Sequence, residues 1–193
     1  MTLIGFLIFI IVILISLSVH EFAHAKAADV LGDPTPRMAG RLTLNPLSHI
    51  DIIGLLALIF VRIGWAKPVP INSYNFRDPN KGMMITGLAG PVSNFFLAWI
   101  LAIFLKYIPI SNAVWIEVVQ YAIWINLALM TFNLLPVPPL DGSRIFTQYF
   151  PVEWQINLER YGFFILIGII IFPPTQELLF LIINSIYGLL MRI

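Results

Sequence analysis

Five consecutive residues, His20-Glu21-Phe22-Ala23-His24, have the composition and spacing of a metal-binding helix. Two histidines four positions apart lie on one face of an α-helix, one turn from each other, so both imidazoles can bind one Zn²⁺. Glu21 then projects beside the metal, where its carboxylate can act as the general base for a metal-bound water. The pattern therefore predicts a hydrolytic site with one zinc ion. The alternative is a pair of histidines that reach the membrane interface beside a solvated Glu21.

A catalytic zinc site has three protein ligands and one open position, so a third ligand is expected elsewhere in the chain. His49 is a candidate by residue type, and the candidate carboxylates are Asp51, Asp78 and Asp141. Asp141 follows three prolines and precedes Gly142, so it lies where a helix has stopped and the chain turns sharply. We favour Asp141 as the third ligand, with a helix N-cap as its alternative role. His49 and Asp51 are expected to have structural roles or to orient ligands.

The composition is that of an integral membrane protein. Of the 193 residues, 59% are hydrophobic and only 11% are charged, against about 25% charged in soluble domains. The net charge of +1 gives no basic face for nucleic acid, so a nucleic-acid partner is excluded. The absence of cysteine excludes disulfides and cysteine-bound zinc. The chain is thus expected to be a single all-α intramembrane domain, residues 1–193, in a lipid bilayer.

Apolar runs predict a polytopic bundle of about five spanning helices. The first helix carries the two histidines and ends at Gly32-Asp33-Pro34. A run of about 14 residues is too short to cross and is expected to be re-entrant or non-spanning. The predicted segments are Leu3 to Val30, the short run Ile52 to Trp65, Ile85 to Ile108, Ala113 to Leu135, Tyr161 to Phe172 and Leu178 to Met191.

Basic residues indicate the orientation, because cytoplasmic loops are enriched in lysine and arginine. Most lie in the last turns of the first segment, between it and the third, or after Leu135, and one is at the end of the chain: Lys26, Arg37, Arg41, Lys67, Arg77, Lys81, Arg144, Arg160 and Arg192. We therefore expect a multi-pass protein of the cell's inner or plasma membrane, with its N-terminus outside and its C-terminus in the cytoplasm. This arrangement returns Asp141 to the same side as His24.

The stretch from Gly64 to Phe76 is rich in proline and β-favouring residues, so we expect a small extended, β-like loop. At membrane depth such a backbone must be buried in protein or line a wet cavity. Its Lys67 to Phe76 part could pair with an unwound stretch of a substrate helix. The alternative is an ordinary cytoplasmic loop.

Together, the residues resemble the site-2 protease family, which consists of intramembrane zinc metalloproteases. The resemblance rests on the histidine motif paired with Leu140-Asp141-Gly142, and it covers most of the chain. The segments Ala89-Gly90-Pro91-Val92-Ser93-Asn94 and Arg41-Leu42-Thr43-Leu44-Asn45-Pro46 are also similar to family segments. The chain resembles the small members that have neither a PDZ nor a CBS domain.

The resemblance implies a function and a set of site residues. Family members hydrolyse peptide bonds in or near the transmembrane segments of other membrane proteins. By resemblance, His20, His24 and Asp141 are the zinc ligands and Glu21 is the general base. Asn94 is implied as a polar group that helps to bind the substrate backbone or the oxyanion, with a helix–helix hydrogen bond as its alternative role. The competing function is a non-hydrolytic membrane protein that binds or transports metal ions, although such carriers often show repeated halves and this sequence does not.

Overall fold

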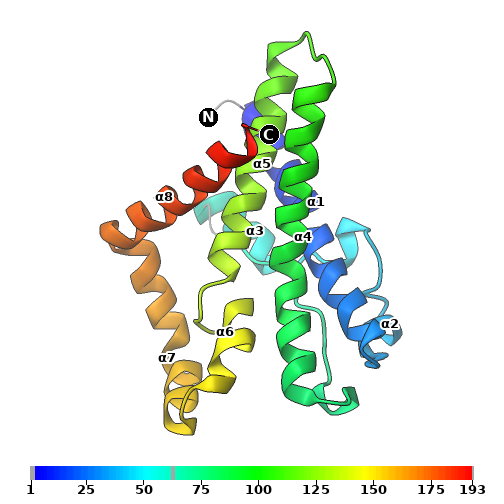
Figure 1. The fold of residues 1–193 in the computed structure, drawn as a ribbon, viewed down its shortest axis with the longest axis vertical. Helices are drawn as coiled ribbons and strands as arrows, with labels where there is room; N and C mark the ends of the chain where they lie inside the picture. Colours follow the sequence, from blue (N-terminus) through cyan, green and yellow to red (C-terminus); the bar gives the residue numbers. More distant parts are fainter. Residues whose placement is uncertain (1–2, 62–63, 193) are drawn as a thin grey trace. The chain divides into compact units, whose positions relative to one another are not determined.

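The computed structural model describes residues 3–61 and 64–192; it is 77% helical, and those parts of the chain form no β-sheet (Figure 1). Residues 62 and 63 of the predicted Ile52 to Trp65 segment lie outside the described residues, as do Met1, Thr2 and Ile193. The predicted all-α membrane class is confirmed.

The chain forms two compact units, Met1–Gly90 and Pro91–Ile193. The first contains α1 (Leu3–Val30), α2 (Thr35–Met38), η1 (Pro46–Ser48), α3 (Ile52–Val61) and η2 (Ser73–Asn75). Helix α4 (Pro79–Tyr107) contains the boundary between the units. The second unit continues with α5 (Ala113–Asn133), α6 (Asp141–Phe146), η3 (Thr147–Tyr149), α7 (Val152–Ile171) and α8 (Pro173–Leu190). A single functional domain over residues 1–193 stays a prediction.

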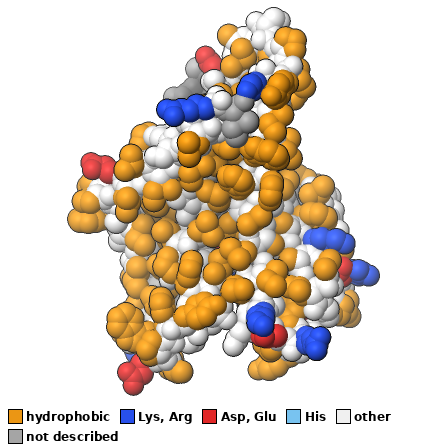
Figure 2. Space-filling view, in the orientation of Figure 1, with side chains coloured by type: hydrophobic (Ala, Val, Ile, Leu, Met, Phe, Trp, Pro, Cys, Tyr) orange, Lys and Arg blue, Asp and Glu red, His pale blue; other side chains and the backbone are white. Residues whose placement is uncertain are grey.

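Four helices in the described residues are long and apolar enough to cross a membrane: Ile4–Val30, Pro79–Tyr107, Ala113–Asn133 and Val152–Ile171. About five were expected. Helix α8 is not among the four, because its 18 residues include polar Gln176, Glu177 and Asn184. Helix α3 has ten residues, about 15 Å, against a hydrocarbon core of roughly 30 Å, as expected of a non-spanning segment. Hydrophobic side chains predominate on the visible face in Figure 2, as lipid contact requires.

Three helices begin before the apolar runs that predicted them, because their first turns are polar. Proline starts two of them, since its missing amide hydrogen is not needed at the first helical position. The Asp78 carboxylate accepts a hydrogen bond from the Lys81 amide at 3.1 Å and thereby caps one of these helices. The corrected starts are Pro79 instead of Ile85 for α4, Val152 instead of Tyr161 for α7, and Pro173 instead of Leu178 for α8.

In the second unit, the core lies where α5 packs on α8 and on the later turns of α4 (Figure 1). The turn between α4 and α5 ends at Asn112, whose side chain accepts from the Val114 amide at 2.9 Å and caps α5. The indole of Trp124 donates to Asn184 on α8 at 3.2 Å. The buried side chains of this cluster are Ala98, Ala102, Ile123, Leu127, Ile183 and Leu190.

In the first unit, α1 ends at Val30, and Gly32 follows with a φ of 105° that favours glycine. The backbone then passes through short turns to an extended stretch, where Ala66 forms an antiparallel bridge with Ile50. Residues 64–72 contain no helix, as predicted. Residues Ser73–Asn75 form a 3₁₀ turn instead of continuing the extended chain, because the Asn72 side chain accepts from the Tyr74 amide at 3.2 Å.

Candidate metal centre

The imidazoles of His20 and His24 converge on one face of α1. Their Nε2 atoms are 3.0 Å apart, and the two ring planes are nearly perpendicular, at 83°. Both side chains are buried, with 3% of each residue exposed. The i, i+4 spacing therefore brings the two imidazoles together, as was predicted from the sequence.

The orientation of His24 is fixed from α4. Its Nδ1 atom is 2.6 Å from the carbonyl oxygen of Thr86. A carbonyl only accepts hydrogen bonds, so this contact assigns the imidazole proton to Nδ1 and leaves the lone pair on Nε2. Metal-binding histidines commonly have such a carbonyl behind them, because it sets the tautomer and the ring orientation.

Gly90 gives the two imidazoles the space that they occupy against α4. A Cβ atom at this position would lie 2.3 Å from His24 Nε2 and 2.6 Å from His20 Nε2. Any side chain here would thus displace the ring nitrogens themselves. The packing of the imidazoles therefore requires glycine at this helical position. The sequence pattern alone does not reveal this steric requirement.

The two imidazoles fit a zinc ion. Nitrogen ligands of a tetrahedral Zn²⁺, bound at about 2.0–2.1 Å, lie roughly 3.3 Å from each other. The Nε2 atoms of His20 and His24 are 3.0 Å apart, so a small movement of either ring gives the bound geometry. The lone pair left on His24 Nε2 supplies the deprotonated donor that the metal requires.

Glu21 lies next to the histidines but interacts with the extended stretch of the first unit. Its Oε2 atom accepts a hydrogen bond from the backbone amide of Val69 at 3.2 Å. Both residues are buried, with 9% of Glu21 and 5% of Val69 exposed. The bond holds one carboxylate oxygen in a defined direction and leaves the other oxygen for further interactions.

Asp141, the predicted third ligand, belongs to the second unit and is the first residue of α6. It is buried and follows the turn that contains the prolines. Glycine is required at position 142, the second residue of α6, because a Cβ there would lie 2.3 Å from the carbonyl oxygens of Leu134 and Leu135. Binding of the metal by Asp141 stays a prediction.

Asn94 is also in the second unit, on α4, and is fully buried. Its Nδ2 donates to Oδ1 of Asn126 on α5 at 2.8 Å. This is the helix–helix hydrogen bond that was predicted as the alternative role of Asn94. The predicted contact with substrate stays a prediction.

The other candidate ligands are engaged locally. Asp51 caps α3 by accepting from the Gly54 amide at 2.8 Å, and Asp78 caps α4 as described above. The Nε2 atom of His49 is 2.8 Å from the Thr43 carbonyl oxygen. These contacts support structural roles for His49 and Asp51.

The roles of four residues that organise this region were not predicted from the sequence. Thr86 acts through a backbone carbonyl and Gly90 through the absence of a side chain, so neither gives a compositional signal. Asp33 was predicted only as part of a helix end, although Asp followed by Pro-Thr is typical of a side-chain-capped turn. For Arg41 the sequence indicated only a cytoplasmic charge in a segment similar to the family, but its side chain is buried.

Comparison with known proteins gives matches over nearly the whole chain. Residues 106–172 match the model of "Peptidase family M50". The chain is 36% identical to the Bacillus subtilis protein named "Putative zinc metalloprotease YwhC", over 91% of this chain and 85% of that protein. It is 31% identical to "Putative zinc metalloprotease Rip2" of Mycolicibacterium smegmatis, over 90% of this chain and 71% of that protein. No solved structure matches the chain significantly.

Proposed function

The chain belongs to peptidase family M50, the site-2 proteases, and from this membership we propose that it is an intramembrane zinc endopeptidase. It hydrolyses peptide bonds in or near the transmembrane segments of other membrane proteins. The observation that carries the proposal is the convergence of the His20 and His24 Nε2 atoms beside Glu21, inside an apolar helix. Ionisable groups there are costly and are retained for function.

One zinc ion is held by His20, His24 and Asp141 in this proposal. The paired imidazoles, the carbonyl behind His24 and the space left by Gly90 support the two nitrogen ligands. The sequence order and the family resemblance support Asp141. When bound, zinc lowers the pKa of a water ligand to about 7 and polarises the scissile carbonyl.

The residues of the chain then have separate tasks. Glu21 takes a proton from the attacking water and returns it to the leaving amine. The Val69 amide holds one oxygen of that carboxylate, so the proton moves through the other. Asn94 helps to bind the substrate backbone or to stabilise the oxyanion, in exchange for part of its bonding to Asn126.

The substrate is a transmembrane helix that unwinds before it is cut, because helical carbonyls are bonded internally. The extended stretch offers the unwound segment a backbone to pair with: within the described residues, the Pro70 carbonyl and the Ile71 amide make no hydrogen bond. The enzyme acts as one domain, residues 1–193, in the inner or plasma membrane. Its N-terminus is outside and its C-terminus is cytoplasmic, as the basic residues indicate.

The experiment compares purified wild-type protein with Glu21→Gln, and with Glu159→Gln as the control for an exposed glutamate. Each is assayed for bound zinc and for cleavage of a panel of single-span membrane proteins whose helices contain helix-breaking residues. We expect Glu21→Gln to keep its zinc and to lose cleavage by about 10²–10⁴-fold, whereas Glu159→Gln retains both. Cleavage by Glu21→Gln within a few-fold of wild type would refute the mechanism. Bound zinc without cleavage by any variant would favour the non-hydrolytic metal-binding alternative.

A further inference from the structure

Residues 66–72, here called the crossing segment, run extended past the residue proposed as general base. The segment is joined to residues 49–50 by the Ala66 bridge and by a hydrogen bond from the Lys67 amide to the His49 carbonyl, at 2.9 Å. At its centre, the Val69 amide donates to Glu21. The position of this one amide depends on what holds the segment at its two ends.

Arg41 holds the beginning of the crossing segment. Its guanidinium donates to the carbonyl oxygens of Lys67 and Pro68, the latter at 2.9 Å, and to that of Ser48. Only 6% of Arg41 is exposed, and no carboxylate in the described parts of the chain pairs with it. A buried guanidinium without a counter-ion is costly, so backbone carbonyls as its partners indicate a specific task.

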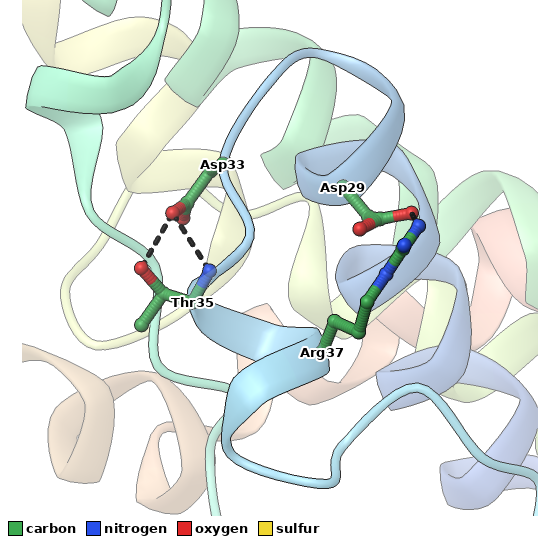
Figure 3. Close-up of polar contacts among 4 residues, drawn as sticks. All are labelled: Asp29, Asp33, Thr35 and Arg37. Carbon is green, nitrogen blue, oxygen red and sulfur yellow. Dashed lines mark hydrogen bonds and ion pairs between the residues drawn. The ribbon is translucent and has the colours of Figure 1, made fainter.

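Asp33 holds the other end. Its Oδ2 atom accepts from the Asn72 amide at 2.7 Å, and its Oδ1 atom accepts from the Asn75 side chain at 2.7 Å. Oδ1 also accepts from the amide and hydroxyl of Thr35, at 3.0 and 2.5 Å, and Figure 3 shows both bonds. The carboxylate is fully buried and has hydrogen bonds to both oxygens, so it is a rigid attachment point.

Both attachment points belong to the stretch that directly follows α1, the helix that carries Glu21. The chain therefore leaves α1, supplies Asp33 and Arg41, and receives the crossing segment between them. Val69 lies between the contacts at Lys67 and Pro68 on one side and at Asn72 on the other. Two buried charged groups thus fix a single amide relative to a single carboxylate.

We propose that Arg41 and Asp33 are positioning residues that hold the crossing segment so that its Val69 amide orients the Glu21 carboxylate. This inference rests on the proposed function of Glu21 as general base. Neither residue touches the metal ligands, so their loss should lower turnover without lowering metal binding.

The first test measures zinc content and kcat for Arg41→Ala, Arg41→Lys and Asp33→Asn. The control is Arg37→Ala, because Arg37 lies in the same stretch but its exposed side chain pairs with Asp29, at 2.6 Å, and not with the crossing segment (Figure 3). We expect Arg41→Ala and Asp33→Asn to retain zinc and to lose at least about tenfold in kcat. Arg41→Lys should be intermediate, since an ammonium reaches fewer carbonyls, and Arg37→Ala should match wild type.

The second test does not require activity. Because the chain has no cysteine, Val69→Cys introduces a single buried thiol into the crossing segment, and Val12→Cys places a buried thiol in α1 as the reference. We expect Arg41→Ala and Asp33→Asn to raise the rate of maleimide labelling at position 69 several-fold and to leave the rate at position 12 unchanged.

Unchanged labelling at position 69 in both variants would overturn the inference, as would faster labelling with unchanged kcat. Equal acceleration at positions 12 and 69 would also overturn it, since that result means general loosening. If Glu21→Gln proves active, the proposed function fails, while the labelling result still reports whether the segment is held.

Discussion

The Nδ1 atom of His24 on α1 donates to the carbonyl oxygen of Thr86 on α4 across 2.6 Å. One backbone carbonyl therefore sets the tautomer and the direction of a metal-binding imidazole. The same helix supplies Gly90, one turn further along, against which both imidazoles pack. Helix α4 thus shapes the site through a backbone carbonyl at Thr86 and through the missing side chain at Gly90.

Gly90→Ala should strip the metal while leaving the helix intact. The new Cβ would lie 2.3 Å from His24 Nε2, whereas alanine is favoured over glycine in a helix by about 1 kcal/mol. We expect zinc content and cleavage to fall at least about tenfold with an unchanged circular dichroism spectrum. Gly168→Ala in α7 is the control, because a Cβ there meets nothing within 4 Å. Full zinc content in Gly90→Ala would contradict the packing argument.

Single alanine substitutions should separate the metal ligands from other polar residues. We expect His20→Ala, His24→Ala and Asp141→Ala each to lower bound zinc, because each removes one ligand of three. His49→Ala should keep most of it, since its ring contacts the Thr43 carbonyl. Metal analysis after dialysis provides the measurement. Loss of zinc in His49→Ala together with retention in Asp141→Ala would reverse the assignment.

Asn94→Ala and Asn126→Ala remove the same hydrogen bond, so comparing them isolates any separate task of Asn94. If Asn94 contacts the oxyanion, its variant should lose about 10²–10³-fold in kcat beyond the loss in Asn126→Ala. Both should lower thermal stability, because each removes this buried hydrogen bond, and Asn126→Ala also removes the bond from Asn126 to the Ala122 carbonyl. Equal kcat values in the two variants would assign Asn94 to helix packing alone.

Single cysteines can test the proposed orientation in intact cells with a membrane-impermeant thiol reagent. Among Thr35, Asn80, Asn112, Glu153 and Arg192, we expect outside labelling only at position 112, in the turn between α4 and α5. Permeabilised cells are the control for reactivity at every position. Outside labelling at position 80 would mean that the short segment containing α3 crosses, which would place His24 and Asp141 on opposite sides. Outside labelling at position 192 would mean that α8 does not cross.

The stability of the first unit should depend on pH through Asp33. Burial alone would raise the pKa of this carboxyl, but hydrogen bonds from Thr35, Asn75 and the Asn72 amide outweigh that effect and lower the pKa below its ordinary value of 3.8. A carboxyl whose pKa is lowered by folding stabilises the folded state fully at pH values above its ordinary pKa. This stabilisation is lost as the pH falls through the lowered, folded-state pKa. The melting temperature of wild type should therefore be higher than that of Asp33→Asn near neutral pH, and the difference should shrink below about pH 4. A difference that is constant with pH would contradict this.

The parts of the protein that sequence predicts well depend on periodic spacing. Histidines at i and i+4 converge because helix geometry alone sets their separation. The end of α1 at Val30 and the start of α5 at Ala113 follow from Gly32 and from the Asn112 cap, which are local signals. Helices with polar first turns, such as α7, were predicted too short, because those turns do not belong to the apolar run from which the helix was predicted.

Long-range polar contacts were not predictable. The carboxylate of Asp33 meets Asn72 and the guanidinium of Arg41 meets Lys67 only after the chain has folded back by 39 and 26 residues. Sequence shows that these residues are charged, but it does not show which distant backbone atoms they bind. Thr86 is the extreme case, since its contact with His24 uses an atom that every residue has.

The two prolines beside Val69 also bear on how copies of the protein behave when crowded in a bilayer. Proline has no amide hydrogen, so Val69 carries the only N–H between Lys67 and Ile71, and Glu21 already accepts it. A bare β-edge normally recruits strands from neighbouring molecules and starts aggregation. Positions 68–70 have no donor left to offer such a strand, so pairing is confined to the Pro70 carbonyl and the Ile71 amide. An edge this short can bind one unwound segment but is a poor template for uncontrolled self-association.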